Sequence, residues 1–166
     1  SVPRVVIALE QEEIRLHALD ILRQLGSVAN ESVPALTKLL SDDDAEVQGA
    51  VLKALAAIGP DSASATDAIA TLLANDSEAI QQDDLFALGS IGEGASGSAK
   101  SILTLLKSKT EFNKVADSWA LAQVDSSNAD NTKAAVPALI AEISKKVKRK
   151  TGIKLVQEIR IIGEAK

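Results

Sequence analysis

The chain has 166 residues, of which 46% are apolar, a net charge of −5 and no cysteine. This composition excludes a disordered chain, a disulfide-stabilised fold and a thiolate metal site, and the net negative charge argues against a general nucleic-acid binder. The length suits a single domain with a sizeable core, and no apolar run approaches the ~20 residues of a membrane-spanning helix.

The clearest pattern is an apolar-periodic segment that ends at a glycine or, once, at an aspartate. Five such segments predict helices over 13–26, 46–59, 79–92, 112–125 and 150–163. A shorter predicted helix precedes each one, at 2–9, 33–40, 66–73, 99–106 and 136–143. We call the shorter helix of each pair helix A and the longer one helix B. The final residues of the B helices are 33, 33, 33 and 38 positions apart, which predicts an array of two-helix repeats.

Capping residues recur at equivalent positions between these helices. Those expected to cap helix B are Asp44, Ser77 and Thr110. Those expected to cap helix A are Ser32 and Ser64. Proline falls at the predicted start of helix A, where its missing N–H costs nothing, at Pro3, Pro34 and Pro137. In the last repeat we predict a loop over 126–132 and a turn that contains most of KKVKRK, 145–150.

The repeats lack ankyrin and tetratricopeptide signatures and resemble short HEAT units, in the HEAT-like subgroup that includes phycobiliprotein-lyase repeats. The residues that match are VPAL at 33–36, then Asp44, Glu46 and Val47, then Ala50, Ala54, Leu55, Ile58 and Gly59. The resemblance covers nearly the whole chain. It implies an all-α fold, a right-handed α-solenoid of about five HEAT-like helical hairpins, whose B helices line the concave face. We predict one domain, 1–166, with repeats at approximately 1–30, 31–63, 64–96, 97–129 and 130–166.

One departure from the family concerns the residue after the Val of helix B. The family commonly places Arg there, paired with the Asp of the turn. This chain has Arg15, Gln48, Gln81, Lys114 and Gly152. We therefore expect a weaker polar ladder than in regular HEAT arrays.

A second departure places acids at positions that look apolar in the other repeats. Asp84 takes the position of Val51, and Asp117 follows it one repeat later. Asp83 takes the position of Ala50. Buried ionised carboxylates need partners, and Lys114 is a candidate for Asp117. A carboxylate pair with a raised pKa is the alternative, and the sequence leaves the role of these acids open.

The sequence indicates no catalytic, cofactor or metal site. His17 is the only histidine, and we interpret it as a packed or rim residue. We interpret Asp42, Asp43 and Asp44 as capping and solvated acids, because no DxDxDG calcium loop is present. No nucleophile or base accompanies the acids of the later repeats. GEGASGS, 92–98, lacks the Lys of a phosphate loop and is predicted to be a flexible linker.

The register of Lys53 on helix B is the most informative for binding. It holds Asp20, Lys53, Phe86, Trp119 and Gln157, so the two largest B-helix side chains lie in adjacent repeats. Because neighbouring helices pack about 8–10 Å apart, Phe86 and Trp119 are predicted to form one apolar platform. The alternative is an ordinary core in a slightly rotated helix. Together with the Leu52 register, the candidate partner-binding residues are Leu19, Leu52, Lys53, Leu85, Phe86 and Trp119.

Charge is distributed unevenly along the chain. Residues 145–166 contain eight Lys/Arg and two Glu, whereas 1–144 contain ten Lys/Arg and 21 Asp/Glu. The densest part is a candidate basic patch for an anionic partner, formed by Lys145, Lys146, Lys148, Arg149 and Lys150. The alternative is a solvated helix end.

We predict a non-catalytic protein-interaction or scaffolding module that binds a protein or peptide on the concave B-helix face. The alternatives are an accessory HEAT domain of a larger enzyme, lyase-like by resemblance, and a nucleic-acid-binding array, which the acidic body disfavours. Both terminal helices are apolar on more than one side, whereas a solenoid needs polar outer faces at its ends. We therefore expect either a longer array or self-association, with contacts between unlike ends favoured by the charge distribution.

Overall fold

The computed structural model describes residues 2–108 and 114–151. Within these residues every regular element is a helix, and the helices of the first four repeats come in the predicted pairs. The A helices are α1 (Val2–Ala8), α3 (Val33–Leu39), α5 (Thr66–Thr71), which η3 (Leu72–Ala74) extends, and α7 (Ala99–Ser108). The B helices are α2 (Glu12–Leu25), α4 (Ala45–Ile58), α6 (Glu78–Ile91) and α8 (Lys114–Val124). The last helix is α9 (Ala129–Thr151).

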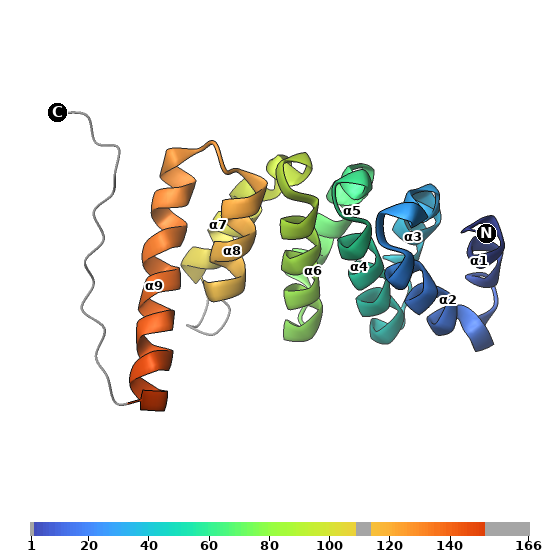
Figure 1. Ribbon diagram of the computed structural model, residues 1–166, viewed down its shortest axis with the longest axis horizontal. Coiled ribbons are helices and arrows are strands. Elements are labelled where there is room, and N and C mark those ends of the chain that lie inside the picture. The colour runs from blue at the N-terminus through green and yellow to red at the C-terminus, as the bar shows by residue number, and fades with distance from the viewer. Residues whose placement is uncertain (1, 109–113, 152–166) are drawn as a thin grey trace.

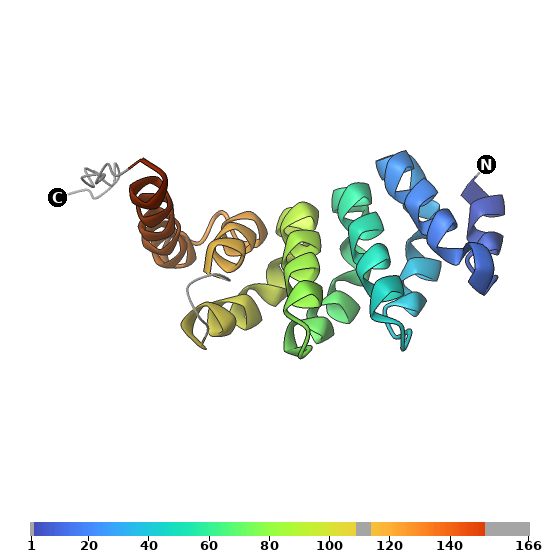
Figure 2. The same cartoon turned by 90° about the horizontal axis from the view of Figure 1, so that it is seen from below.

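The pairs stack side by side into a solenoid of two layers. Figure 1 shows the B helices α2, α4, α6 and α8 in one row, in chain order, and each packs against the next. Figure 2 shows the A helices in a second layer behind them. The two ends of the row turn toward the B-helix side, so the B helices line its inner face (Figure 2). This is the predicted all-α solenoid. No helix among the described residues is long and apolar enough to cross a bilayer.

The B helices α4 and α6 begin at a side-chain cap, and α2, α4 and α6 each end at a glycine. The Asp44 carboxylate accepts a hydrogen bond from the Glu46 N–H at 2.8 Å, and the Ser77 hydroxyl accepts one from the Ile80 N–H at 3.5 Å. Both predicted caps are confirmed, and Thr110 lies outside the described residues. The C-terminal glycines have φ values of +56° at Gly26, +74° at Gly59 and +72° at Gly92, which side-chain-bearing residues rarely adopt.

The core is a continuous apolar layer between the two rows of helices. The equivalent leucines of three successive B helices, Leu55, Leu88 and Leu121, are completely buried, as their common register predicts. Similar contacts recur in each repeat, which is the packing expected of a solenoid in which a unit touches mainly its neighbours.

The residue after the Val of helix B makes the same contact in three repeats. Arg15, Gln48 and Gln81 each donate a side-chain hydrogen bond to the carbonyl oxygen six residues earlier, in the turn before the helix. Arg15 also forms an ion pair with Asp42 of the next repeat, at 3.1 Å. Gln48 and Gln81 therefore make the same hydrogen bond to the preceding turn as Arg15 does.

The segments between repeats differ from the prediction. η1 (Gly26–Ser32) and η2 (Gly59–Ala65) are 3-10 helices, and η4 (Gly92–Ser98) consists of 3-10 turns with a kink at Ala95 rather than a loop. The predicted flexible linker at 92–98 is therefore wrong, because Ala95 and Ser98 are buried. Ser32 and Ser64 do not cap helix A. The Ser32 hydroxyl donates to the Ala29 carbonyl instead, and α5 begins after Ala65.

The C-terminal part shows the largest difference. Residues predicted as a loop, a helix A and a basic turn form the single 23-residue helix α9. Pro137 lies inside this helix rather than at its start. α9 packs against α8 and runs in the opposite direction to it (Figure 1). The predicted helix B of the fifth repeat, 150–163, lies almost entirely outside the described residues.

Candidate functional site

Phe86 on α6 and Trp119 on α8 form the predicted platform on the B-helix face. Their ring centroids are 5.6 Å apart and the rings are inclined by 17°, which is a stacked pair. The Phe86 side chain is 53% exposed, and Trp119 is partly buried. We call Phe86 and Trp119 the aromatic platform. An exposed aromatic pair is the kind of surface on which protein partners anchor.

A glycine on α6 allows the indole of Trp119 to lie close to the helix. A Cβ added to Gly89 would lie 2.3 Å from the Trp119 ring, so no larger residue fits without moving the ring. The equivalent residue of α4 is Ala56. The indole therefore rests directly on the α6 backbone, between the two helices.

Beside the platform, the ends of the B helices enclose an open hollow of about 570 Å³. It is lined by Gly89, Ser90, Glu93 and Gly94 from α6 and η4, and by Trp119, Gln123 and Ser126 from α8 and the turn after it. The Ser126 hydroxyl donates a 2.8 Å hydrogen bond to the Glu93 carboxylate. Trp119 thus belongs to both the aromatic platform and this hollow.

The rest of the predicted partner-binding register divides between the core and the surface. Leu19, Leu52 and Leu85 are almost fully buried, and the structure corrects their assignment to the partner surface. The reason is that a step of one residue turns a helix by about 100°, which takes the Leu52 register from the groove into the core. Lys53 is exposed and forms an ion pair with Asp83 of the next repeat, at 2.9 Å.

Asp84 and Asp117 are completely buried. Among the described residues, neither carboxyl oxygen of Asp84 has a hydrogen-bond partner. Burial raises the pKa of Asp84 from 3.8 to about 8, because the ionised form loses its hydration. The side chain of Lys114 lies outside the described residues, so its predicted pairing with Asp117 stays a prediction.

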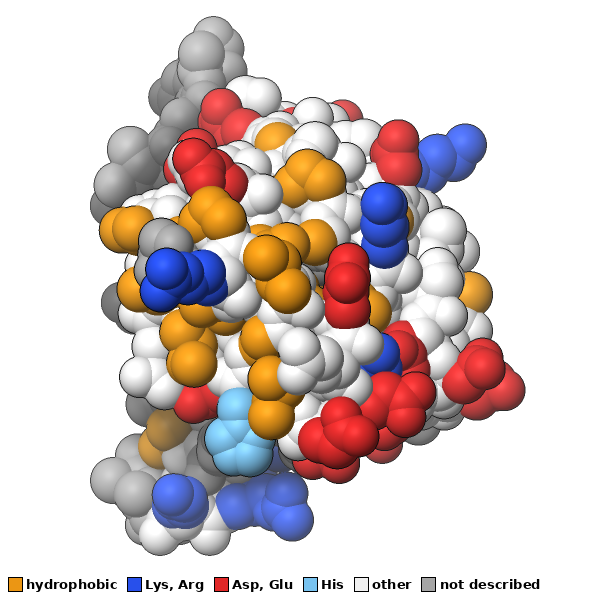
Figure 3. All heavy atoms as spheres, turned by 90° about the vertical axis from the view of Figure 1, so that its right-hand side faces the viewer, with side chains coloured by type: hydrophobic (Ala, Val, Ile, Leu, Met, Phe, Trp, Pro, Cys, Tyr) orange, Lys and Arg blue, Asp and Glu red, His pale blue; other side chains and the backbone are white. Residues whose placement is uncertain are grey.

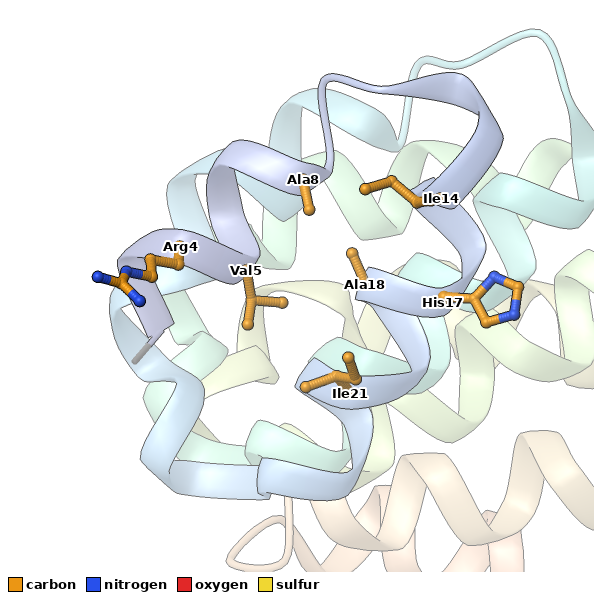
Figure 4. A pocket seen from close by; sticks show the side chains of 7 residues that line it. All are labelled: Arg4, Val5, Ala8, Ile14, His17, Ala18 and Ile21. Carbon is orange, nitrogen blue, oxygen red and sulfur yellow. The ribbon is translucent and has the colours of Figure 1, made fainter.

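The N-terminal end of the solenoid presents an apolar face. Ile7 is 61% exposed, Ile14 42% and Ile21 46%. Figure 3 shows hydrophobic side chains gathered in the middle of this face, with acids toward one edge. A smaller hollow of about 230 Å³ separates α1 from α2 (Figure 4), lined by Arg4, Val5, Ala8, Ile14, His17, Ala18 and Ile21. We call this surface the N-terminal face, and His17 lies exposed at its rim.

Comparison with known proteins accounts for this architecture. The family model for HEAT repeats matches residues 2–89, more than half of the chain. The chain belongs to the HEAT-repeat family. No curated protein matches its sequence. Two similar solved structures are crystal structures of engineered proteins from the Northeast Structural Genomics Consortium, each 24% identical over 90% of this HEAT-repeat chain, with TM-scores of 0.63 and 0.64. The chain spans 72% of the first and 44% of the second, and at this identity the likeness shows the fold alone.

The basic patch of the HEAT-repeat chain lies in the last turns of α9. Lys145, Lys148, Arg149 and Lys150 are exposed there, and the Lys146 side chain lies outside the described residues. Cations at a helix C-terminus are stabilised by the helix dipole, so this placement has a structural reason of its own.

One feature of the surface was missed at the level of sequence. The hollow beside Trp119 is formed by the ends of three B helices, which no linear pattern brings together. Gly89 is the one signal that was available, since its neighbours in register are Ala56 and Ala122, and the loss of a methyl group there marks a close approach.

Proposed function

We propose that this HEAT-repeat chain is a non-catalytic binding module that holds a protein or peptide against the aromatic platform. The observation that supports this proposal is the exposure of Phe86, 53%, on the inner face of the solenoid. Along the described B helices, the exposed members of the same register are charged: Asp20 forms an ion pair with Arg23, and Lys53 one with Asp83. The apolar anchor therefore has a polar surrounding, which is typical of binding surfaces.

The alternatives have less support. An accessory role in a larger enzyme would place the chemistry either elsewhere in that enzyme or near the acids of α6 and α8, and neither hollow described above is lined by Asp83, Asp84 or Asp117. Among the described residues, no three His, Asp or Glu side chains form a group that could hold a metal ion. Binding of nucleic acid would need a continuous basic groove, whereas the described cluster of basic side chains is confined to the end of α9.

A peptide selection tests the proposal. Peptides would be selected from a random phage-displayed library on the wild-type chain, and their affinities measured for the wild type and for Phe86→Ser. We expect Phe86→Ser to weaken binding at least about tenfold, the loss for an anchor residue worth ~1.4 kcal/mol. Lys38→Ser is the control, because Lys38 is exposed on the A helix α3, outside both the B-helix face and the ends of the row. Selected peptides that bind Phe86→Ser as tightly as wild type would overturn the proposal.

A second proposal concerns what covers the two ends of the solenoid. Eight large hydrophobic side chains are exposed among the described residues, and all except Phe86 lie near the ends of the row: Ile7, Ile14, Ile21, Leu25 and Val28 at one, Val136 and Ile143 at the other. Soluble monomers rarely expose grouped apolar side chains. We propose that copies of the chain associate head to tail, with the N-terminal face of one copy against α9 of the next.

Charge complementarity favours this arrangement. α2 begins with Glu12 and Glu13, and α9 ends with Lys148, Arg149 and Lys150. Figure 1 shows the start of α2 and the end of α9 along the same edge of the row, at opposite ends. A second copy that continues the row would bring these acidic and basic turns together, and Val136 and Ile143, seven residues apart on one side of α9, would meet the isoleucines of α2.

Sedimentation velocity across a dilution series tests the association. We expect concentration-dependent growth that stops in Ile21→Glu and in Ile143→Glu, each of which blocks one end. An equimolar mixture of these two variants should then form a dimer, because each supplies the intact end that the other lacks. A wild type that stays monomeric at high concentration would overturn the association. Dimers of Ile143→Glu alone would instead identify a two-fold contact between N-terminal faces.

A further inference from the structure

The hollow beside Trp119 has the chemistry of a site for an organic cation. We propose that it binds a basic side chain, Lys or Arg, of the protein or peptide that the aromatic platform holds. The proposal rests on the proposed function, because Trp119 belongs to both the platform and the hollow. The proposal specifies that the ligand carries a positive charge at this site, and it names the residue that recognises that charge.

The shape of the hollow suits a long side chain. Its volume, about 570 Å³, lies within the range of pockets that hold small ligands. Gly89, Gly92 and Gly94 line it, so the backbone itself forms much of the wall. Trp119 supplies the large apolar surface, against which the methylene groups of a Lys or Arg side chain can pack.

The electrostatics of the hollow favour a positive charge. α6 ends at Ile91 and α8 at Val124, and Pro60 follows the end of α4 closely, so three B helices direct their C-terminal ends toward this region. A helix C-terminus carries a partial negative charge from its unpaired carbonyl groups. No Lys, Arg or His is among the residues that line the hollow.

Glu93 adds a full negative charge at a defined position. Its carboxylate accepts the hydrogen bond from Ser126 through one oxygen, and a carboxylate has a second oxygen that can accept from a ligand. An indole ring attracts cations through its face, so Trp119 and Glu93 together match an ammonium or guanidinium group. A single carboxylate is a poor site for a metal ion, which requires several oxygen ligands, and this favours the organic cation.

The test uses Trp119 as its own reporter, because it is the only tryptophan of the chain. The probes are the peptide Gly-Arg-Gly and the same peptide with citrulline, which is neutral and nearly isosteric with arginine. Titration followed by tryptophan fluorescence should show saturable binding of the arginine peptide, weakened by added salt, and at least about tenfold weaker binding of the citrulline peptide.

Matched variants locate the charge that is responsible. Glu93→Gln keeps the shape of the side chain and the acceptor for Ser126, and it should weaken the arginine peptide by about tenfold, the loss of one charge-assisted contact. Glu31→Gln, on exposed η1, is the control and should leave binding unchanged. Equal binding of the two peptides, or of the arginine peptide to wild type and Glu93→Gln, would overturn the inference.

The outcome is separable from that of the proposed function. If library peptides depend on Phe86 while the arginine peptide is not preferred over its citrulline counterpart, the platform stands and the cation site fails. If the arginine peptide depends on Glu93 while no library peptide depends on Phe86, the platform fails and the hollow remains a cation site.

Discussion

The helices α4 and α6 show how two repeats of one shape differ in chemistry. Both have 14 residues, begin at a capped turn and end at a glycine with nearly the same φ, +74° and +72°. Three of the positions at which they differ change the chemistry most: Val51 and Asp84, Lys53 and Phe86, Ala56 and Gly89. The comparison teaches that caps, terminal glycines and a few leucines determine the hairpin, whereas the remaining positions are free to specialise.

Two of these differences in α6 concern Trp119. Gly89 removes the methyl group that would meet the indole, and Phe86 provides the ring on which Trp119 stacks. Asp84 adds a buried carboxyl group to the same helix. We interpret α6 as the specialised helix of the row and α4 as the structural reference.

The largest expected effect tests whether the two cores are equivalent. Leu55→Ala in α4 and Leu88→Ala in α6 should each lower the free energy of unfolding by about 2–5 kcal/mol, since both side chains are completely buried. Urea melts followed by circular dichroism measure both losses. A loss below about 0.5 kcal/mol for either variant would show that the shared register does not place both leucines in one core.

The second prediction gives α6 the residue of α4. Asp84→Val should raise the free energy of unfolding at neutral pH by about 1–3 kcal/mol, because it removes a buried polar group without a hydrogen-bond partner among the described residues. Urea melts of both proteins measure the gain. Destabilisation by valine would show that Asp84 makes an interaction worth more than its burial costs.

The same residue predicts a dependence on pH. The folded-state pKa of Asp84, about 8, lies above its ordinary value of 3.8, so the folded chain holds a proton that the unfolded chain releases. The contribution of Asp84 to the free energy of unfolding should therefore be highest below about pH 4. It should fall by up to ~1.4 kcal/mol per pH unit as the pH rises, and level off above about pH 8. Asp84→Asn should remove this slope, and a slope that persists unchanged would assign it to other groups.

A smaller effect compares the two caps. Asp44→Ala and Ser77→Ala should each cost about 0.5–2 kcal/mol. We expect the larger loss in α4, because the Asp44 bond is 2.8 Å long and the Ser77 bond is 3.5 Å. Thermal or urea melts decide the order. A larger loss for Ser77→Ala would mean that the length of the cap hydrogen bond does not determine how much each cap stabilises its helix.

The smallest effect on stability comes from restoring the alanine of α4 at Gly89. Because Trp119 is only partly buried, we expect its ring to move away from the new methyl group, at a cost below about 1 kcal/mol. The tryptophan emission should shift to longer wavelength as the indole becomes more exposed. An unchanged emission spectrum would show that the close approach to Gly89 does not hold the ring.

Most of the array was predictable because its signals are local. The predicted helices at 46–59 and 79–92 agree within one residue with α4 and α6, since a cap, an apolar period of 3.6 residues and a final glycine all occur within one short segment. The pairing of Phe86 with Trp119 was predictable from the repeat itself, because residues at the same register of adjacent repeats lie side by side.

The rest depended on contacts between segments. The stretch 126–144 has no glycine to end a helix, and packing against α8 compensates for the hydrogen bond that Pro137 cannot make, so α9 continues through both predicted breaks. Leu52 and Leu85 were assigned to the wrong side because a rotation by one residue separates groove from core. The hollow beside Trp119 exists only where helix ends meet.

The glycines that end the B helices also determine how far apart the repeats lie. The Cβ position of each glycine faces a main-chain carbonyl of the next B helix: Ala57 for Gly26 at 3.4 Å, Ser90 for Gly59 at 3.7 Å and Gln123 for Gly92 at 3.8 Å. Backbone meets backbone at these points, so these contacts do not depend on the side chains that line the groove. Mutations can therefore change the groove of one repeat while these backbone contacts between neighbouring repeats stay the same.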